Sequence, residues 1–198
     1  MEPTDNNQIV LASGSPRRLQ LMQDAGYEVE VVVPGIPEDV CSSDCPSVLV
    51  ECLAFAKARY VAEHRTKGVV LGADTVAVLD DRVIGKPDDA DHARRILRQL
   101  SDTTHQVLTG ICLIDAATGL RVMGHDVTHI TMKPMSQRDI EDYVTSGEAM
   151  GKAGAYAIQE SGDRFVERIY GSFTNVVGLP MELVAVMLKQ LDRRLKNR

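Results

Sequence analysis

Two hydrophobic patterns alternate along this chain. Short runs rich in β-branched residues predict strands near residues 9–12, 28–33, 69–73, 76–79, 82–84, 106–114, 120–132 and 165–170. Longer stretches with apolar residues at helical spacing predict helices over 16–25 and 46–63, one capped by Asp88, one opened by a Ser136–Asp139 capping box and a last one from Pro180. This alternation is typical of an α/β fold, whose β-rich middle can form a second lobe.

The first transition between the two patterns also carries charge. The apolar run at 9–12 passes into Ser13–Arg18, which predicts a strand, a loop and a helix in succession. Backbone N–H groups at a helix N-terminus lack intrahelical partners and attract anions, and Pro16 suits the first helical position. Arg17 and Arg18 add forked donors that match phosphate oxygens. The junction indicates a phosphate site, although an exposed helix start with two solvated arginines would have the same sequence.

Three more charged residues stand where a ligand site is plausible. Asp74 follows the apolar strand predicted at 69–73, and ligands of open α/β sheets lie beyond the carboxyl ends of such strands. A carboxylate there can ligate a divalent cation, act as a general base or cap a turn. Lys86, between a glycine and a proline, and Lys57, among small apolar residues, are either phosphate ligands or ordinary surface lysines.

Other segments give weaker signals. Glu38 and Asp39 lie in a proline-rich loop that can hold a metal or be an ordinary acidic loop. The segment 147–159 combines small residues with a lysine, a tyrosine and a glutamine, which permits close approach to a flat ligand or a packed turn. The sequence has neither a P-loop nor a dinucleotide-binding glycine motif. His125 and His129, with no metal-binding motif around them, are interpreted as structural.

The composition restricts the partners of the chain. Its 198 residues are 44% hydrophobic and 25% charged, as in an ordinary globular protein. The formal charge of -6 disfavours nucleic acid, so an anionic ligand must meet a local basic cluster. With no membrane-spanning run or signal peptide in the sequence, we expect a cytoplasmic protein with no membrane association and a flexible segment at 1–7. The four cysteines, Cys41, Cys45, Cys52 and Cys112, lack metal-site spacing and are predicted to be reduced thiols.

Seven blocks, in order from residue 8 to about residue 190, resemble the Maf family of nucleoside triphosphate pyrophosphatases. They are LASGSPRR (11–18), AFAKA (54–58), GADTV (72–76), GKP (85–87), HQVLTG (105–110), GKAGAYAIQ (151–159) and GSFTNVVGLP (171–180). Each block is weak alone, but the ordered set is specific. The resemblance implies a single Maf/ITPase-like α/β domain over 1–198, with an elongated, mixed, twisted sheet flanked by helices, two lobes around a central cleft, and assembly as a homodimer.

The same resemblance implies roles for individual residues. It implies triphosphate contacts by Ser13, Arg17, Arg18, Lys57 and Lys86, a general base at Asp74, and a divalent metal cation, Mg²⁺ or Mn²⁺, held by Asp74 and Glu38. In the family's dTTP/UTP subgroup specificity follows three positions, here Arg17, Thr75 and Gln159. The sequence departs from the family at Ala149, Glu160 and Phe173, where proline, glycine and another aromatic residue are common; these departures bear on base preference.

Charge and hydrogen bonding are consistent with these roles. The cations would neutralise the triphosphate before water attacks the α-phosphorus. The Gln159 amide, with one donor and one acceptor group, complements uracil or thymine, but a flipped amide suits cytosine, so a backbone group or Thr75 must break the symmetry. Hydrolysis of dTTP and UTP to monophosphate and pyrophosphate, clearing non-standard nucleotides, is the leading hypothesis. The alternatives are a nucleotide-responsive binding protein that restrains septum formation and cell division, and the same reaction on another nucleotide.

Overall fold

Long buried strands determine the architecture of this computed structural model, which describes residues 9–37, 40–159 and 161–198. The strands are β1 (Ile9–Ala12), β2 (Val29–Val31), β3 (Val69–Leu79), β4 (Arg82–Ile84), β5 (Thr104–Asp115), β6 (Arg121–Met132) and β7 (Val166–Tyr170). The α-helices are α1 (Pro16–Asp24), α2 (Pro46–Ala62), α3 (Ala90–Leu100), α4 (Gln137–Thr145), α5 (Phe173–Val177) and α6 (Met181–Lys196). The predictions for 1–7, Glu38, Asp39 and Glu160 fall outside the described residues.

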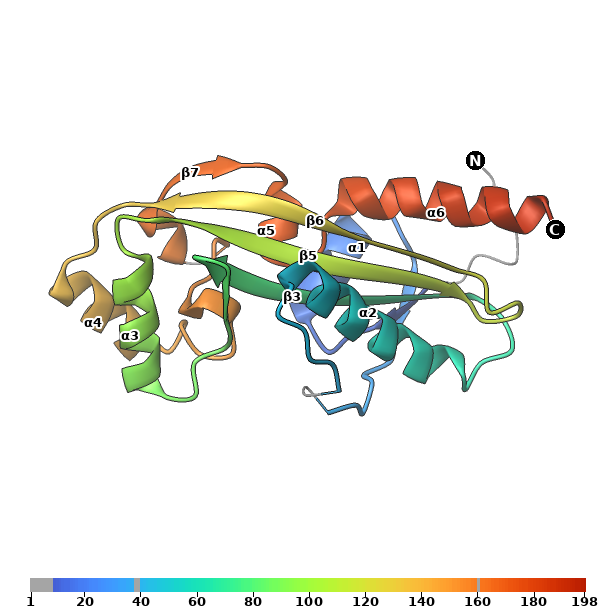
Figure 1. The fold of residues 1–198 in the computed structure, drawn as a ribbon, viewed down its shortest axis with the longest axis horizontal. Coiled ribbons are helices and arrows are strands. Elements are labelled where there is room, and N and C mark those ends of the chain that lie inside the picture. The colour runs from blue at the N-terminus through green and yellow to red at the C-terminus, as the bar shows by residue number, and fades with distance from the viewer. Residues whose placement is uncertain (1–8, 38–39, 160) are drawn as a thin grey trace.

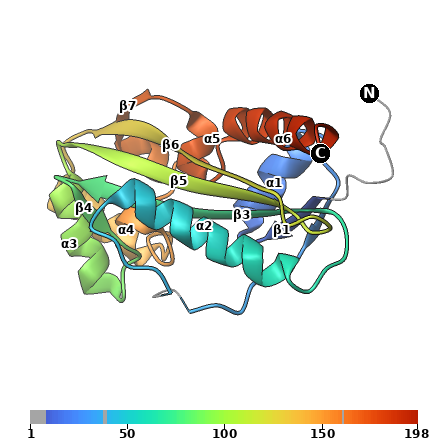
Figure 2. The same cartoon turned by 45° about the vertical axis from the view of Figure 1, so that its right-hand side comes forward.

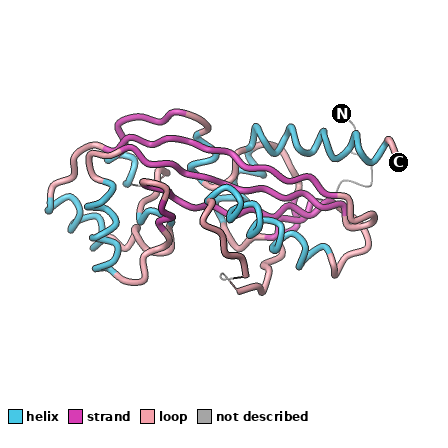
Figure 3. The backbone as a smooth tube through the Cα atoms, in the orientation of Figure 1, coloured by secondary structure: helices cyan, strands magenta, loops and turns pink. Residues whose placement is uncertain are grey.

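The strands form one mixed sheet in the order β2-β1-β3-β5-β6-β7, with β4 also paired to β3. The β1 strand is parallel to β2 and β3, whereas the other pairs are antiparallel. Figures 1 and 3 show the strands running along the long axis of the molecule, with helices on both sides. The predicted α/β class, with a mixed sheet flanked by helices, is confirmed.

Two glycines bring α2 unusually close to the sheet. A Cβ at Gly72 of β3 would lie 2.3 Å from the carbonyl oxygen of Ala54, and one at Gly110 of β5 would lie 2.3 Å from that of Val50. The helix can therefore pack directly on β3 and β5 only because both strands lack a side chain there. This contact fixes the position of Lys57, which lies on α2 between Ala54 and the C-terminal end of the helix.

The apolar core divides along the sheet. Opposite α2, helices α1 and α6 cover the sheet with buried residues that include Met22 and Met187. At the other end, α3 and α4 pack around Tyr143, which contacts Phe165 edge-on at a ring separation of 5.4 Å. Figure 2 shows α3 and α4 at one end of the sheet and β1 with α1 toward the other. No helix of the described residues is long and apolar enough to span a membrane.

Most predicted elements are present, including the capping box of Ser136 and Asp139. Three details of the prediction are wrong. The runs at 69–73 and 76–79 form one continuous strand, so Asp74 lies within β3 and not at its end. Asp89, not Asp88, caps α3, because the Asp88 carboxylate instead contacts the His92 ring. The short helix α5 was not predicted, since its five residues are too few to show a periodic pattern.

The cysteine prediction is also wrong in part. Cys41, in the loop before α2, and Cys52, on α2, form a disulfide across an 11-residue separation, with Cα atoms 6.1 Å apart. Cys45 and Cys112 are free thiols. The spacing of Cys41 and Cys52 matches no recognisable motif, because the loop that turns back onto the helix brings them together.

Candidate active site

The site lies at a gap along one edge of β3. Pairing with β1 ends at Gly72, and pairing with β4 begins at Ala77. On this edge no strand of the described residues pairs with the segment 73–76, although its other edge stays paired with β5. Because β1 is parallel to β3, its carboxyl end and the following Ser13–Arg18 turn meet the gap. Asp74 was expected beyond the carboxyl end of its own strand. It lies instead beyond the carboxyl end of the neighbouring strand β1, which is also where ligands of α/β sheets bind.

A cavity of about 570 Å³ opens at this gap. The structure brings together all the predicted site residues that it describes, because each lines this cavity: Ser13, Arg17, Arg18, Lys57, Asp74, Thr75, Lys86 and Gln159. The remaining predicted residue, Glu38, lies outside the described residues. Side chains separated by up to 146 positions in the sequence thus share one cavity, which is large enough for a small-molecule ligand.

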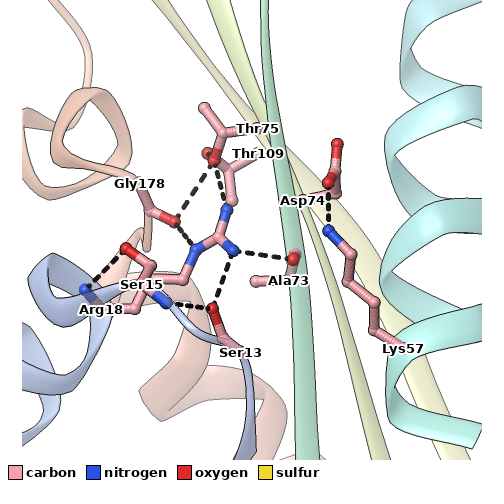
Figure 4. Close-up of polar contacts among 9 residues, drawn as sticks. All are labelled: Ser13, Ser15, Arg18, Lys57, Ala73, Asp74, Thr75, Thr109 and Gly178. Carbon is pink, nitrogen blue, oxygen red and sulfur yellow. Dashed lines mark hydrogen bonds and ion pairs between the residues drawn. The ribbon is translucent and has the colours of Figure 1, made fainter. Parts of the chain in front are cut away.

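Arg18 is the buried hub of the site, with only 9% of its surface exposed. Its Nε donates to the carbonyl oxygen of Gly178 at 2.8 Å, and its Nη1 donates to that of Ala73 at 3.0 Å. Nη1 also donates to Ser13 Oγ at 3.2 Å, and Nη2 donates to Thr75 Oγ1 at 2.9 Å. Figure 4 shows the guanidinium joining these groups on one side of β3. Arg18 therefore ties the β1 loop, β3 and the turn before α6 together.

The neighbouring Arg17 has a different environment. It lines the cavity, is partly exposed, and its guanidinium has no hydrogen-bond or ion-pair partner within the described residues. Ser13 also has a donor left for a ligand, although its Oγ already accepts two hydrogen bonds, from Ser15 N at 3.1 Å and from Arg18 Nη1 at 3.2 Å. Both acceptor positions of the Ser13 hydroxyl are thus occupied, which leaves its hydrogen for an anion. Arg17 and Ser13 can bind phosphate directly, whereas most Arg18 donors are already used.

The opposite face of β3 carries an ion pair. Lys57 Nζ lies 2.5 Å from Asp74 Oδ1, and the two side chains are 21% and 17% exposed. Strand alternation puts Asp74 on the α2 side and Thr75 on the Arg18 side, as Figure 4 shows. The Lys57 ammonium fixes one carboxylate oxygen and keeps further donors for a ligand. The pair can therefore orient a carboxylate beside a bound anion.

A helix cap positions the backbone acceptor of Arg18. The α5 residue Asn175 is fully buried, and its Nδ2 donates to Val107 O and Thr128 Oγ1, both at 2.9 Å. These bonds dock α5 on β5 and β6. Gly178 then ends α5 with a φ of 127°, a conformation that favours glycine, and directs its carbonyl oxygen to Arg18. The Gly171–Pro180 block, which was noted only as a motif, thus forms one wall of the site.

The end of the cavity that carries Gln159 is lined by residues 150–153 and 156–159. Tyr156 and Gln159 line it, together with the apolar side chains of Val107 and Met150. Gly154 N donates to the carbonyl oxygen of Gly85 at 3.3 Å, which joins this segment to the residue before Lys86. This end therefore combines flat apolar surface with an amide, as a nucleobase requires.

Sequence reasoning missed several parts of this site. Val107, Met150 and Val176 line the cavity, but isolated apolar residues carry no signal that separates a cavity wall from the core. Lys152 also lines it; its segment 147–159 was recognised as a possible ligand surface, but the lysine itself was given no role. The carbonyl acceptors of Ala73 and Gly178 had no side-chain signature.

The described residues can supply part of the coordination shell of a divalent cation, with phosphate oxygens of a bound ligand supplying the rest. No group of three or more His, Cys, Asp or Glu side chains in 9–37, 40–159 and 161–198 is placed to hold a metal ion. Mg²⁺ in phosphate-transfer sites commonly takes one or two carboxylates and completes its shell with water and phosphate oxygens. Asp74, with one oxygen bound by Lys57, has a second oxygen available for such a role.

Comparison with known proteins identifies relatives over most of the chain. A family model described as "Maf-like protein" matches residues 8–191. The dTTP/UTP pyrophosphatase of Desulforamulus reducens is 44% identical over 181 residues, which cover 91% of this chain and 95% of the relative. The protein of the same name from Ruminiclostridium cellulolyticum is 40% identical over 188 residues, covering 94% and 97%. The Ham1 protein structure from Staphylococcus aureus aligns at 15% identity and a TM-score of 0.46, covering 64% and 72%.

Proposed function

We propose that this chain, which belongs to the Maf-like protein family, hydrolyses dTTP and UTP to the nucleoside monophosphate and pyrophosphate. One observation carries the proposal: a single cavity combines a partly buried carboxylate, cationic side chains and an amide-bearing segment at its far end. This arrangement matches the anionic and the flat halves of a nucleotide. The names of relatives at 40–44% identity support the same substrates.

The triphosphate is expected to bind along the β3 gap. Arg17 would grip phosphate oxygens with its unpaired guanidinium, and Ser13 would donate its hydroxyl hydrogen. Lys57 and Lys86 add positive charge from α2 and from the loop after β4. A nucleoside triphosphate carries about four negative charges, so this cluster is needed for an anion to bind a protein of net charge -6.

Asp74 is the proposed general base. Its carboxylate removes a proton from the attacking water, whose oxygen forms a bond to the α-phosphorus while the bond to the bridging oxygen breaks and pyrophosphate leaves. Lys57 holds the carboxylate in place through Oδ1. Arg18 acts one step away from the reacting atoms, because its bonds position Ser13 and Thr75.

A divalent cation, Mg²⁺ or Mn²⁺, is the proposed cofactor. The second Asp74 oxygen would hold it together with phosphate oxygens, and the family resemblance adds Glu38 as a further proposed ligand. When bound, the cation would neutralise charge that develops on the phosphates. Removal of divalent ions by a chelator should therefore abolish turnover, and adding back Mg²⁺ or Mn²⁺ should restore it.

The decisive experiment analyses products. Wild-type protein is incubated with dTTP or UTP and Mg²⁺, and we expect equimolar monophosphate and pyrophosphate; orthophosphate as the first product would refute the reaction. Asp74→Asn should lose turnover and keep nucleotide binding, measured by calorimetry. Asp81→Asn is the matched control, since Asp81 lies in the exposed β3–β4 turn with a φ of 59°, which asparagine tolerates. Binding without turnover by the wild type would instead favour a nucleotide-responsive binding protein.

A further inference from the structure

The amide thought to select the base is not held by its own contacts. Gln159 is exposed at the cavity wall, and its side chain makes no hydrogen bond within the described part of the chain. An amide that is free to rotate can present either its N–H or its oxygen to a base edge. Selectivity at Gln159 therefore depends on how firmly the backbone around it is held.

Two buried contacts hold the segment on the N-terminal side of Gln159. Tyr143 Oη accepts a hydrogen bond from Ala157 N at 3.1 Å, and Tyr156 Oη is 2.9 Å from His105 Nε2. Both tyrosines are buried, and they anchor the segment to α4 and to β5. These contacts hold residues 156–157, which precede Gln159 in the chain.

Glu148 supplies the anchor on the C-terminal side. Its Oε2 accepts from the backbone N of Ser161 at 3.0 Å and from Ser161 Oγ at 2.7 Å. The carbonyl oxygen of Glu148 also accepts from Lys152 Nζ at 2.5 Å. Glu148 thus closes the segment 148–161 into a loop, with Gln159 two residues from the closure. The Glu148 side chain does not line the cavity, so its role is separate from direct substrate contact.

We propose that Glu148 is a positioning residue for nucleobase selection: its carboxylate closes the 148–161 loop and so determines how Gln159 presents its amide. The inference rests on the proposed function, because it assigns a cause for the preference of the same site for dTTP and UTP over CTP. Acceptance of hydrogen bonds is the essential property, since Ser161 provides two donors to one oxygen. A neutral glutamine at this position can still accept from both.

The test measures kcat and KM for dTTP, UTP and CTP in three variants. Glu148→Ala should raise KM for dTTP and UTP about tenfold, because only a fraction of the loop remains competent to bind, and kcat should change little. CTP hydrolysis should be unchanged or improved, so the dTTP to CTP ratio of kcat/KM falls about tenfold. Glu148→Gln should restore the ratio to within about threefold of wild type. Asp163→Ala, an exposed acidic residue nearby, is the control and should match wild type.

Several outcomes would overturn the proposal. An unchanged dTTP to CTP ratio in Glu148→Ala, an equal loss of kcat on every nucleotide, or a wild type that does not discriminate against CTP each contradicts it while leaving the pyrophosphatase activity intact. A wild type inactive on all three nucleotides would refute the proposed function instead. Hydrogen exchange then still decides on the loop closure, since Glu148→Ala must speed exchange of amides in 152–159 relative to Asp163→Ala.

Discussion

Substitution of the two adjacent arginines should separate stability from activity. Arg18→Ala removes four hydrogen bonds. The buried carbonyl oxygen of Ala73 loses its side-chain donor, and that of Gly178 keeps only the longer bond from Thr75 Oγ1 at 3.3 Å. Each unsatisfied buried acceptor costs roughly 1 to 3 kcal/mol. Burial lowers the pKa of the Arg18 guanidinium, which the Asp74 carboxylate partly offsets, so relief of this desolvation returns part of the cost. We expect the free energy of unfolding to fall by about 2 to 4 kcal/mol.

Arg17→Ala should have the opposite profile. Arg17 has no partner within the described residues, so its loss should change the free energy of unfolding by less than about 0.5 kcal/mol. Its guanidinium is free to meet charge on the phosphates, and its removal should lower kcat/KM by about a hundredfold. Arg18→Lys adds a check on geometry, because one ammonium cannot reach Gly178, Ala73 and Thr75 from the fork positions, so the lysine should recover less than half of the lost stability.

Urea denaturation and steady-state kinetics on the same preparations test both profiles. Activity must be measured in the native baseline, so that any loss in Arg18→Ala is not unfolding. If Arg17→Ala destabilises the fold as much as Arg18→Ala, or if Arg18→Ala is as stable as wild type, the division of labour between the two residues is refuted.

Three further predictions concern the scaffold around the site. Gly72→Ala should unfold several kcal/mol more easily and lose most activity, because the new Cβ meets the Ala54 carbonyl; the urea midpoint measures this, and a wild-type midpoint would contradict the close helix contact. Reduction, or Cys41→Ser, should cost about 3 kcal/mol of stability by freeing the loop closed with Cys52, and no change in melting temperature with dithiothreitol would disprove this. Burial lowers the pKa of His105 to about 4, below its usual 6.5, so the unfolded chain binds a proton at a higher pH than the folded chain. The free energy of unfolding should therefore fall by roughly 3 kcal/mol as the pH drops from 6.5 to 4. His105→Gln should flatten this dependence of stability on pH, measured by urea denaturation at several pH values.

The sequence predicted which residues line the cavity better than it predicted what each one contacts. Periodicity located the strands and the Ser13–Arg18 turn, because these are local patterns. The difference between Arg17 and Arg18 was not predictable, since it depends on Gly178, 160 positions away, reaching the guanidinium. The disulfide of Cys41 and Cys52 was missed for the same reason. A role that depends on contacts between residues far apart in the sequence cannot be predicted from the spacing of residues within a short motif.

The break in pairing at the edge of β3 explains why the site lies where it does. A β1 strand that continued to pair beyond Gly72 would cover the backbone edge of 73–76, and the Ser13–Arg18 turn could not meet β3 beside Asp74. Because β1 ends there, the Ala73 carbonyl accepts from Arg18 instead of from a strand, and the carboxylate remains accessible. Arg18 thus replaces the missing strand as the partner of β3. A residue inserted between Ala12 and Ser13 would displace the turn that carries Arg18, whereas one inserted at Gly119 would only lengthen the exposed β5–β6 turn. Neither insertion changes the hydrophobic pattern of the adjoining strands. The first should therefore lower kcat/KM more than the second.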